Sequence, residues 1–185
     1  IYNYTTEETQ LEIKPKIIDD KRALYGKKII MRYEQKKLKN IYIPQNAQAS
    51  TITEGYKKTI NDTTQIELKS EFNDDMTSAS LEGFFNDGIL DSLRLSGMAT
   101  TVYHLFEDSL YKGKNVTSGD TIIMNFKEKE LNNIIVNGGS QGKYTPDSLT
   151  NETGQPLKYS AEKIDYNIKT EKTKLLGNAK AYHEN

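Results

Sequence analysis

Three stretches of this chain align with one another without a gap, and this internal repeat constrains the fold more than any other feature. They are residues 26–49, 78–101 and 119–142, which read GKKIIMRYEQKKLKNIYIPQNAQA, SASLEGFFNDGILDSLRLSGMATT and GDTIIMNFKEKELNNIIVNGGSQG. A pattern that recurs in this way is typical of stacked structural units, each of which buries its apolar side against its neighbours.

Each unit predicts two β-strands joined by a turn, because apolar and polar residues alternate on both sides of a short polar segment. A fourth, shorter copy is predicted at residues 161–181. All positions in the six bulky columns of the three long units are apolar except Gly83. These columns hold Ile29, Leu81 and Ile122; Met31, Gly83 and Met124; Tyr33, Phe85 and Phe126; Leu38, Leu90 and Leu131; Ile41, Leu93 and Ile134; and Ile43, Leu95 and Val136, with Ile164, Tyr166, Ile168 and Leu175 in the fourth copy.

The turns inside the units are polar. Asn86-Asp87-Gly88 is a hairpin signal, and residues 34–37 and 127–130 are charged. One detail breaks the alternation, because Leu38 and Ile41 have opposite parity. Either Leu38 faces outward or a β-bulge resets the register, and a bulge is the favoured prediction because bulges are common at such bends.

Small or compact residues close every unit. They are Gln45, Ala47 and Ala49; Gly97, Ala99 and Thr101; Gly138, Ser140 and Gly142; and Gly177, Ala179 and Ala181. Two interpretations are compatible with this taper. The small side chains let the chain bend or a neighbouring backbone approach closely, or they widen one side of the interior into a cleft.

The segments between the units are polar. Residues 50–77 predict an added strand pair or a large loop, and residues 143–158, with two prolines, predict a loop. The alternating residues 1–18 are interpreted as the end of an earlier, truncated unit. No helix is expected. We predict one all-β domain over residues 1–185, which is a fragment of a longer protein.

Composition narrows the function classes. With 25 basic and 26 acidic residues, the chain lacks the basic surplus of a nucleic-acid-binding protein. No apolar run approaches the roughly 20 residues that span a bilayer, so no transmembrane segment is predicted. The chain has no cysteine and therefore no disulfide framework.

Two short motifs resemble the OstA-like periplasmic lipopolysaccharide-transport family. The first opens a unit, as in Ser118-Gly119-Asp120-Thr121-Ile122 and Ser160-Ala161-Glu162-Lys163-Ile164, and matches less well at Tyr25-Gly26. The second is Gly177-Asn178-Ala179-Lys180-Ala181, with a partial match at Asn46-Ala47-Gln48-Ala49. The resemblance covers roughly residues 24–185, and the insert at residues 50–77 departs from the family pattern.

This resemblance implies an open, twisted β-jellyroll of stacked antiparallel hairpins whose interior shields acyl chains. It implies a periplasmic location, either as a soluble bridge or as the periplasmic domain of an outer-membrane protein. The implied partners are lipopolysaccharide or a related glycolipid, and other jellyroll transport proteins or further copies of this chain, paired through edge strands.

The residues expected to line a lipid groove are the inward-facing members of the repeat. They are Ile29, Met31, Tyr33, Ile41, Ile43, Leu81, Phe85, Leu93, Leu95, Ile122, Met124, Phe126, Ile134, Val136, Ile164, Tyr166, Ile168 and Leu175. Methionine suits a sliding ligand because its unbranched thioether adapts to varied shapes. The alternative for each of these residues is ordinary core without lipid contact.

We expect no enzymatic activity, no cofactor and no metal site. No nucleophile motif, metalloprotease motif or phosphate-binding loop occurs. His104 and His183 are predicted to be exposed surface residues, and the pairs Asp19-Asp20 and Asp74-Asp75, which lack calcium-loop spacing, to be solvated turns.

Two further hypotheses stay open. The lysines near the turns (Lys36, Lys37, Lys39, Lys112 and Lys114) form a solvated rim or contact an anionic head group. The whole chain has one rival interpretation, a structural or adhesive β-repeat spacer with a filled core and no lipid ligand.

Overall fold

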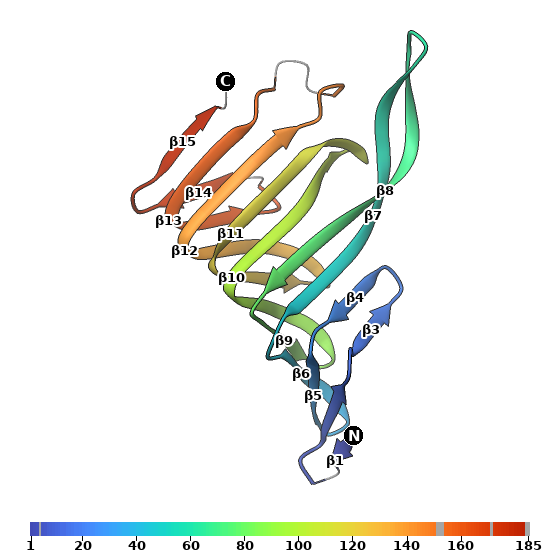
Figure 1. Ribbon diagram of the computed structural model, residues 1–185, viewed down its shortest axis with the longest axis vertical. Helices are drawn as coiled ribbons and strands as arrows, with labels where there is room; N and C mark the ends of the chain where they lie inside the picture. Colours follow the sequence, from blue (N-terminus) through green and yellow to red (C-terminus); the bar gives the residue numbers. More distant parts are fainter. Residues whose placement is uncertain (4, 151–153, 171, 184–185) are drawn as a thin grey trace.

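The computed structural model describes residues 1–3, 5–150, 154–170 and 172–183. Within these ranges the chain is all β and contains no helix, hence no helix that is long and apolar enough to cross a membrane. Fifteen strands form one continuous sheet, which bends sharply into two walls that diverge from a shared edge (Figure 1). The predicted fold class, an open β-jellyroll-like stack of antiparallel strands, is confirmed.

The first wall has the strand order β1-β2-β5-β6-β9-β10-β11-β12-β13-β14, and the second has the order β3-β4-β7-β8-β10-β11-β12-β13-β15. Four long strands pass through both walls: β10 (Ile89–Glu107), β11 (Leu110–Lys127), β12 (Glu130–Pro146) and β13 (Leu157–Asn167). The strands confined to the first wall are β1 (Tyr2–Asn3), β2 (Glu8–Glu12), β5 (Lys28–Glu34), β6 (Lys37–Ile43), β9 (Ser80–Asn86) and β14 (Lys172–Leu176). Those confined to the second wall are β3 (Lys16–Asp19), β4 (Arg22–Tyr25), β7 (Ala47–Asn61), β8 (Thr64–Ser78) and β15 (Lys180–His183).

The tapered ends of the predicted units lie where the chain passes from the first wall to the second. In β10 this corner is Gly97–Met98, and in β12 it is Gly138–Gly139. All four residues have positive φ, and the strand registers shift there. A Cβ atom on Gly97 would lie 2.7 Å from the Cβ atom of Ala79 on the neighbouring corner. The interpretation that small residues permit a bend and a close backbone approach is therefore confirmed at the corners.

The predicted bulge is also confirmed, and it recurs in each of the three complete hairpins of the first wall. In the β5–β6 hairpin Arg32 pairs with Asn40 and Tyr33 pairs with Leu38, which leaves Lys39 as the extra residue. Asp91 is the extra residue of the β9–β10 hairpin, and Asn132 is that of the β11–β12 hairpin. An extra residue reverses the side-chain alternation, so that Leu38 and Ile41 both face the interior.

The core fills the angle where the two walls meet. Its fully buried large side chains belong to the columns on either side of the corner, namely Ile29, Ile43, Leu81, Leu95, Ile122 and Val136. Burial of each such side chain is worth roughly 1.5–3 kcal/mol relative to exposure in water, so these columns supply much of the driving force that closes the angle.

The links between the units are partly as predicted. The segment 50–77 forms a strand pair, because it continues as the β7–β8 hairpin, which projects beyond the second wall (Figure 1). The prediction of a loop over residues 143–158 is wrong at both ends: residues 143–146 extend β12 and residues 157–158 begin β13, where both strands find ladder partners. Residues 151–153 of that link lie outside the described residues.

Strands near both ends of the chain join the stack. At the N-terminus, β2 pairs with β5 in the first wall, and the β3–β4 hairpin joins the second wall through β7. At the C-terminus, Ile164 pairs with Leu175 in the β13–β14 hairpin, as the predicted fourth copy requires.

Candidate functional site

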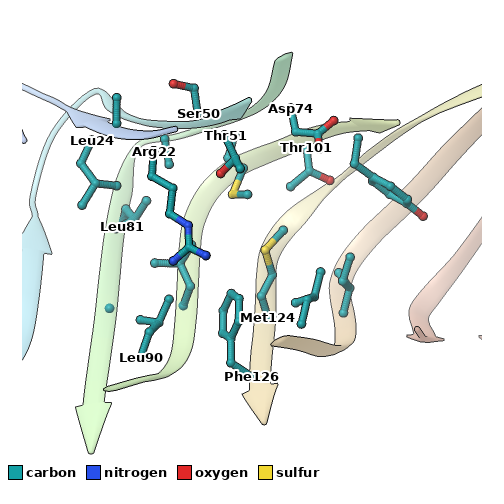
Figure 2. Close-up of a pocket in the computed structure, with 18 of the residues that line it drawn as sticks. Arg22, Leu24, Ser50, Thr51, Asp74, Leu81, Leu90, Thr101, Met124 and Phe126 are labelled. Carbon is teal, nitrogen blue, oxygen red and sulfur yellow. The ribbon is translucent and has the colours of Figure 1, made fainter. Parts of the chain in front are cut away.

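A large apolar cleft of about 680 Å³ lies between the two walls, on the open side of the core. It reaches from the β3–β4 hairpin across the sheet to β13, and Figure 2 shows side chains of both walls pointing into it. Its volume is within the range of about 300–1,000 Å³ typical of small-molecule sites. This cleft is the candidate functional site.

The first wall lines the cleft with bulky side chains. They are Leu38, Ile41, Leu81, Phe85, Leu90, Leu93, Met124, Phe126, Leu131, Ile134, Tyr166 and Ile168, together with Gly83. The hairpins of the repeat place these residues at equivalent positions, so that the cleft surface of this wall is the repeat itself.

The second wall faces them with a mixture of bulky and small side chains, and the small ones come from β7 and β10. Ala49, Ser50 and Thr51 come from β7 and Thr101 from β10. Ala49 and Thr101 are members of the taper, so the small residues of the taper have two different roles. The corner glycines permit the bend, while the alanine and threonine beyond the corner keep the second wall thin and leave space between the walls.

Half of the predicted groove-lining residues do line the cleft: Ile41, Leu81, Phe85, Leu93, Met124, Phe126, Ile134, Tyr166 and Ile168. Six others lie deep in the angle between the walls, with at most 2% of their surface exposed: Ile29, Ile43, Leu95, Ile122, Val136 and Ile164. Met31 and Leu175 pack against the core without lining the cleft, and Tyr33 is partly buried in β5.

Sequence reasoning missed two groups of cleft residues. Leu38, Leu90 and Leu131 occupy a column of the repeat but were not assigned to the groove, and the parity reversal at the bulge was the signal that could have placed them there. Ile17, Leu24 and the other second-wall residues of the cleft, except Ala49 and Thr101, lie in segments outside the aligned repeat, where no internal comparison was possible.

A tyrosine pair bridges the two walls at the β13 end of the cleft. Tyr103 of β10 and Tyr166 of β13 stack with their ring centroids 6.2 Å apart. Asn115 Nδ2 donates a hydrogen bond of 2.8 Å to the Tyr103 hydroxyl, and the Tyr159 hydroxyl donates one of 2.9 Å to Asn115 Oδ1. Burial raises the pKa of Tyr103 well above its ordinary value, so its hydroxyl stays protonated at neutral pH.

A second polar group lies where β8 leaves β10. Asp74 Oδ1 accepts a hydrogen bond of 2.8 Å from the backbone N–H of His104. The same oxygen lies 2.7 Å from the Nδ1 atom of the His104 ring. The pair replaces ladder hydrogen bonds that end at the Asp75–Val102 pair. Phe72 packs against the imidazole with ring centroids 5.2 Å apart.

Two sequence predictions are therefore wrong. His104 is not an exposed surface residue, since only 15% of its side chain is exposed, and Asp74-Asp75 lies within β8 rather than in a turn. Alternation alone could not reveal that a splayed strand would need this polar pair. His183 is exposed and Asp20 lies in a turn with positive φ, both as predicted, whereas Asp19 is the last residue of β3 and not part of the turn.

Charged groups at the cleft come from both walls. Asp19, Arg22 and Asp74 belong to the second wall, and Lys129 belongs to the β11–β12 turn. Within the described ranges, no cluster of three or more His, Cys, Asp or Glu side chains has the arrangement that could hold a metal ion.

Comparisons with known proteins add no relative: no protein-family model matches this chain, and no curated protein matches it. The resemblance to the OstA-like family therefore stays a prediction that rests on its short motifs.

Proposed function

We propose that this protein is a non-enzymatic lipid-binding conduit. It shields acyl chains of lipopolysaccharide or a similar glycolipid while the lipid crosses the periplasm to the outer membrane. The observation that carries the proposal is the apolar cleft between the walls, which is open along one side of the stack and is lined by the repeat.

The energetics of lipid transfer support this proposal. Each methylene of an acyl chain gains about 0.8 kcal/mol on leaving water for an apolar surface. A chain of about a dozen carbons therefore gains on the order of 10 kcal/mol, which only an extended apolar surface provides. Met124 and Phe126 on one wall, facing Ala49 on the other, offer such a surface with space between them.

The cleft contains a position at which it can be blocked without disturbing the fold. A Cβ atom on Gly83 would lie 3.5 Å from Phe85 Cε2 and 3.6 Å from Leu93 Cδ1, which are ordinary contacts. A larger side chain at this position would extend from β9 into the cleft. Gly83→Leu should therefore fill part of the space in which an acyl chain would lie.

We expect the wild-type protein to bind an apolar fluorescent acyl probe saturably, and Gly83→Leu to weaken that binding at least fivefold. The matched control is Arg94→Leu, which places the same side chain at an exposed position of the same wall and should leave the affinity unchanged. Circular dichroism checks that both variants keep their β structure. Absence of saturable binding by the wild type would refute the conduit and leave the structural spacer as the better interpretation.

The proposed partners also include further jellyroll units. The strands at both ends of the stack have one unpaired edge: within the described residues, β14 and β15 pair only with β13, and β3 pairs only with β4. Such edges pair readily with strands of another chain. Pairing would place successive clefts in line, as a conduit across the periplasm requires.

A further inference from the structure

Arg22 presents a positive charge to the apolar cleft without an ion-pair partner. Its side chain extends from β4 into the cleft, among Leu81, Leu90 and Met124 (Figure 2). Across the residues that the structure describes, no carboxylate lies within the 4.0 Å of an ion pair with it. Arg32, the matched arginine of the first wall, differs in this respect because its Nε lies 3.1 Å from Glu8 Oε2.

Two carboxylates, those of Asp19 and Asp74, line the cleft on the same wall as Arg22. Asp19 stands opposite Arg22 in the β3–β4 ladder but makes no ion pair with it. Asp74 accepts its hydrogen bonds from His104, whose backbone N–H lies 2.8 Å away. Across the cleft, Lys129 adds a second cation that has no ion pair among the described residues. The guanidinium therefore remains available to a bound molecule.

Filling the cleft changes the surroundings of this charge. An acyl chain that displaces water from around Arg22 removes hydration from the guanidinium, and an ion that loses water without gaining a partner is strongly disfavoured. A ligand that brings its own oxyanion offsets this cost. Guanidinium suits that role because its fork of N–H donors matches phosphate and carboxylate geometry.

The geometry points to an anionic amphiphile as the occupant, with its acyl chain in the cleft and its phosphate or carboxylate head group on Arg22. This inference rests on the proposed lipid-binding function and adds the class of head group and the residue that selects it. Arg22 is then the head-group contact, in place of the lysines that the sequence suggested (Lys36, Lys37, Lys39, Lys112 and Lys114), none of which lines the cleft. Amphiphiles with uncharged head groups bind through the tail alone.

Calorimetry below the critical micelle concentration tests the inference with dodecyl phosphate and dodecyl maltoside, which share one tail. We expect wild-type protein to bind dodecyl phosphate more tightly than dodecyl maltoside. We expect Arg22→Gln to weaken dodecyl phosphate binding about tenfold, the loss expected for a hydrogen bond to a charged group, and to leave dodecyl maltoside binding unchanged. Arg32→Gln is the matched control and should change neither affinity.

Several results would overturn the inference. Equal affinity of Arg22→Gln and wild type for dodecyl phosphate would do so while leaving the lipid-binding function intact, provided that both detergents bind. An equal loss for both detergents would show that Arg22 shapes the cleft rather than selects a charge. Inorganic phosphate binding as tightly as dodecyl phosphate would reduce the site to a free-anion site, and failure of every tailed probe would remove the proposed function itself.

Discussion

At the residue scale, glycines of the second wall are covered by aromatic rings of the adjacent strand. Gly142 of β12 pairs directly with Tyr159 of β13, and a Cβ atom on Gly142 would lie 2.0 Å from the Tyr159 ring carbon Cζ. The ring is held in place because its hydroxyl donates to Asn115 at 2.9 Å. An aromatic ring over a cross-strand glycine replaces the packing that the glycine lacks and fixes the strand register.

Gly142→Ala should therefore lower the free energy of unfolding by about 1–3 kcal/mol, the cost of overpacking a well-filled site. Urea unfolding at neutral pH measures the change. The loss should shrink to near zero when the same substitution is made in a Tyr159→Ala background, because the methyl group then has room. An equal loss in both backgrounds would contradict the ring–glycine packing.

The corner residues explain what the sequence could and could not predict at this scale. Alternation identified Ile29 and Leu95 as interior, and both are fully buried. It could not separate core from cleft, because both kinds of residue face the same side of the sheet. That distinction depends on distance from the corner, where the walls begin to diverge, and only the position of Gly97 and its equivalents sets that distance.

At the element scale, the repeat predicted the first wall well and the second wall poorly. The hairpins of the first wall repeat in sequence, with Asn86-Asp87-Gly88 as one turn, and their bulges were visible as a break in parity. The second wall is assembled from strand ends and from the β3–β4 and β7–β8 hairpins, which have no equivalents in the other units. Its polar pair, Asp74 and His104, exists because β8 diverges from β10.

One carboxylate reinforces the β4–β7 ladder that joins the β7–β8 hairpin to the β3–β4 hairpin. Glu54 of β7 accepts hydrogen bonds from Lys21 in the β3–β4 turn and from Lys69 of β8, whose Nζ lies 2.6 Å away. The backbone N–H of Ile52 also donates to the Lys21 carbonyl oxygen at 2.8 Å. These contacts join the projecting hairpin to the hairpin that carries Arg22.

The hydrogen bonds from Lys21 and then Lys69 lower the pKa of Glu54 from 4.5 to about 2. A carboxyl group whose pKa is lower in the folded protein than in the unfolded chain stabilises the fold above its unfolded pKa. That contribution is lost as the pH falls from about 4.5 toward about 2. NMR titration of the Glu54 side-chain carboxyl carbon should give a midpoint near the lower value.

Two changes should move that midpoint upward. Lys21→Gln removes the larger cause, and high salt screens an exposed pair. A wild-type midpoint at the ordinary glutamate value would mean that the projecting hairpin is not held by Glu54.

At the scale of the whole molecule, a quasi-one-dimensional stack has two ends, and in the part of the chain that the structure describes both ends have an unpaired strand edge. The C-terminal end exposes one side of β14 and of β15, and the N-terminal end exposes β3 and the short β1. The cleft begins at the β3–β4 end and meets the Tyr103–Tyr166 bridge toward β13. The cleft therefore runs across the strands, so that a strand added at either end would extend a wall rather than lie over the open side of the cleft.

We expect this protein to associate end to end as its concentration rises, with sedimentation velocity showing a growing weight-average mass. Two neighbouring proline substitutions in β15, Ala181→Pro and Tyr182→Pro, test the route. Because successive N–H groups of a strand point to opposite sides, one proline removes a donor from the free edge and the other removes a donor that faces β13. The proline that removes a free-edge donor should leave the protein folded and monomeric. The proline that removes a donor to β13 should loosen β15. A wild-type protein that stays monomeric at millimolar concentration would exclude edge pairing, and association that survives both substitutions would place the contact elsewhere than β15.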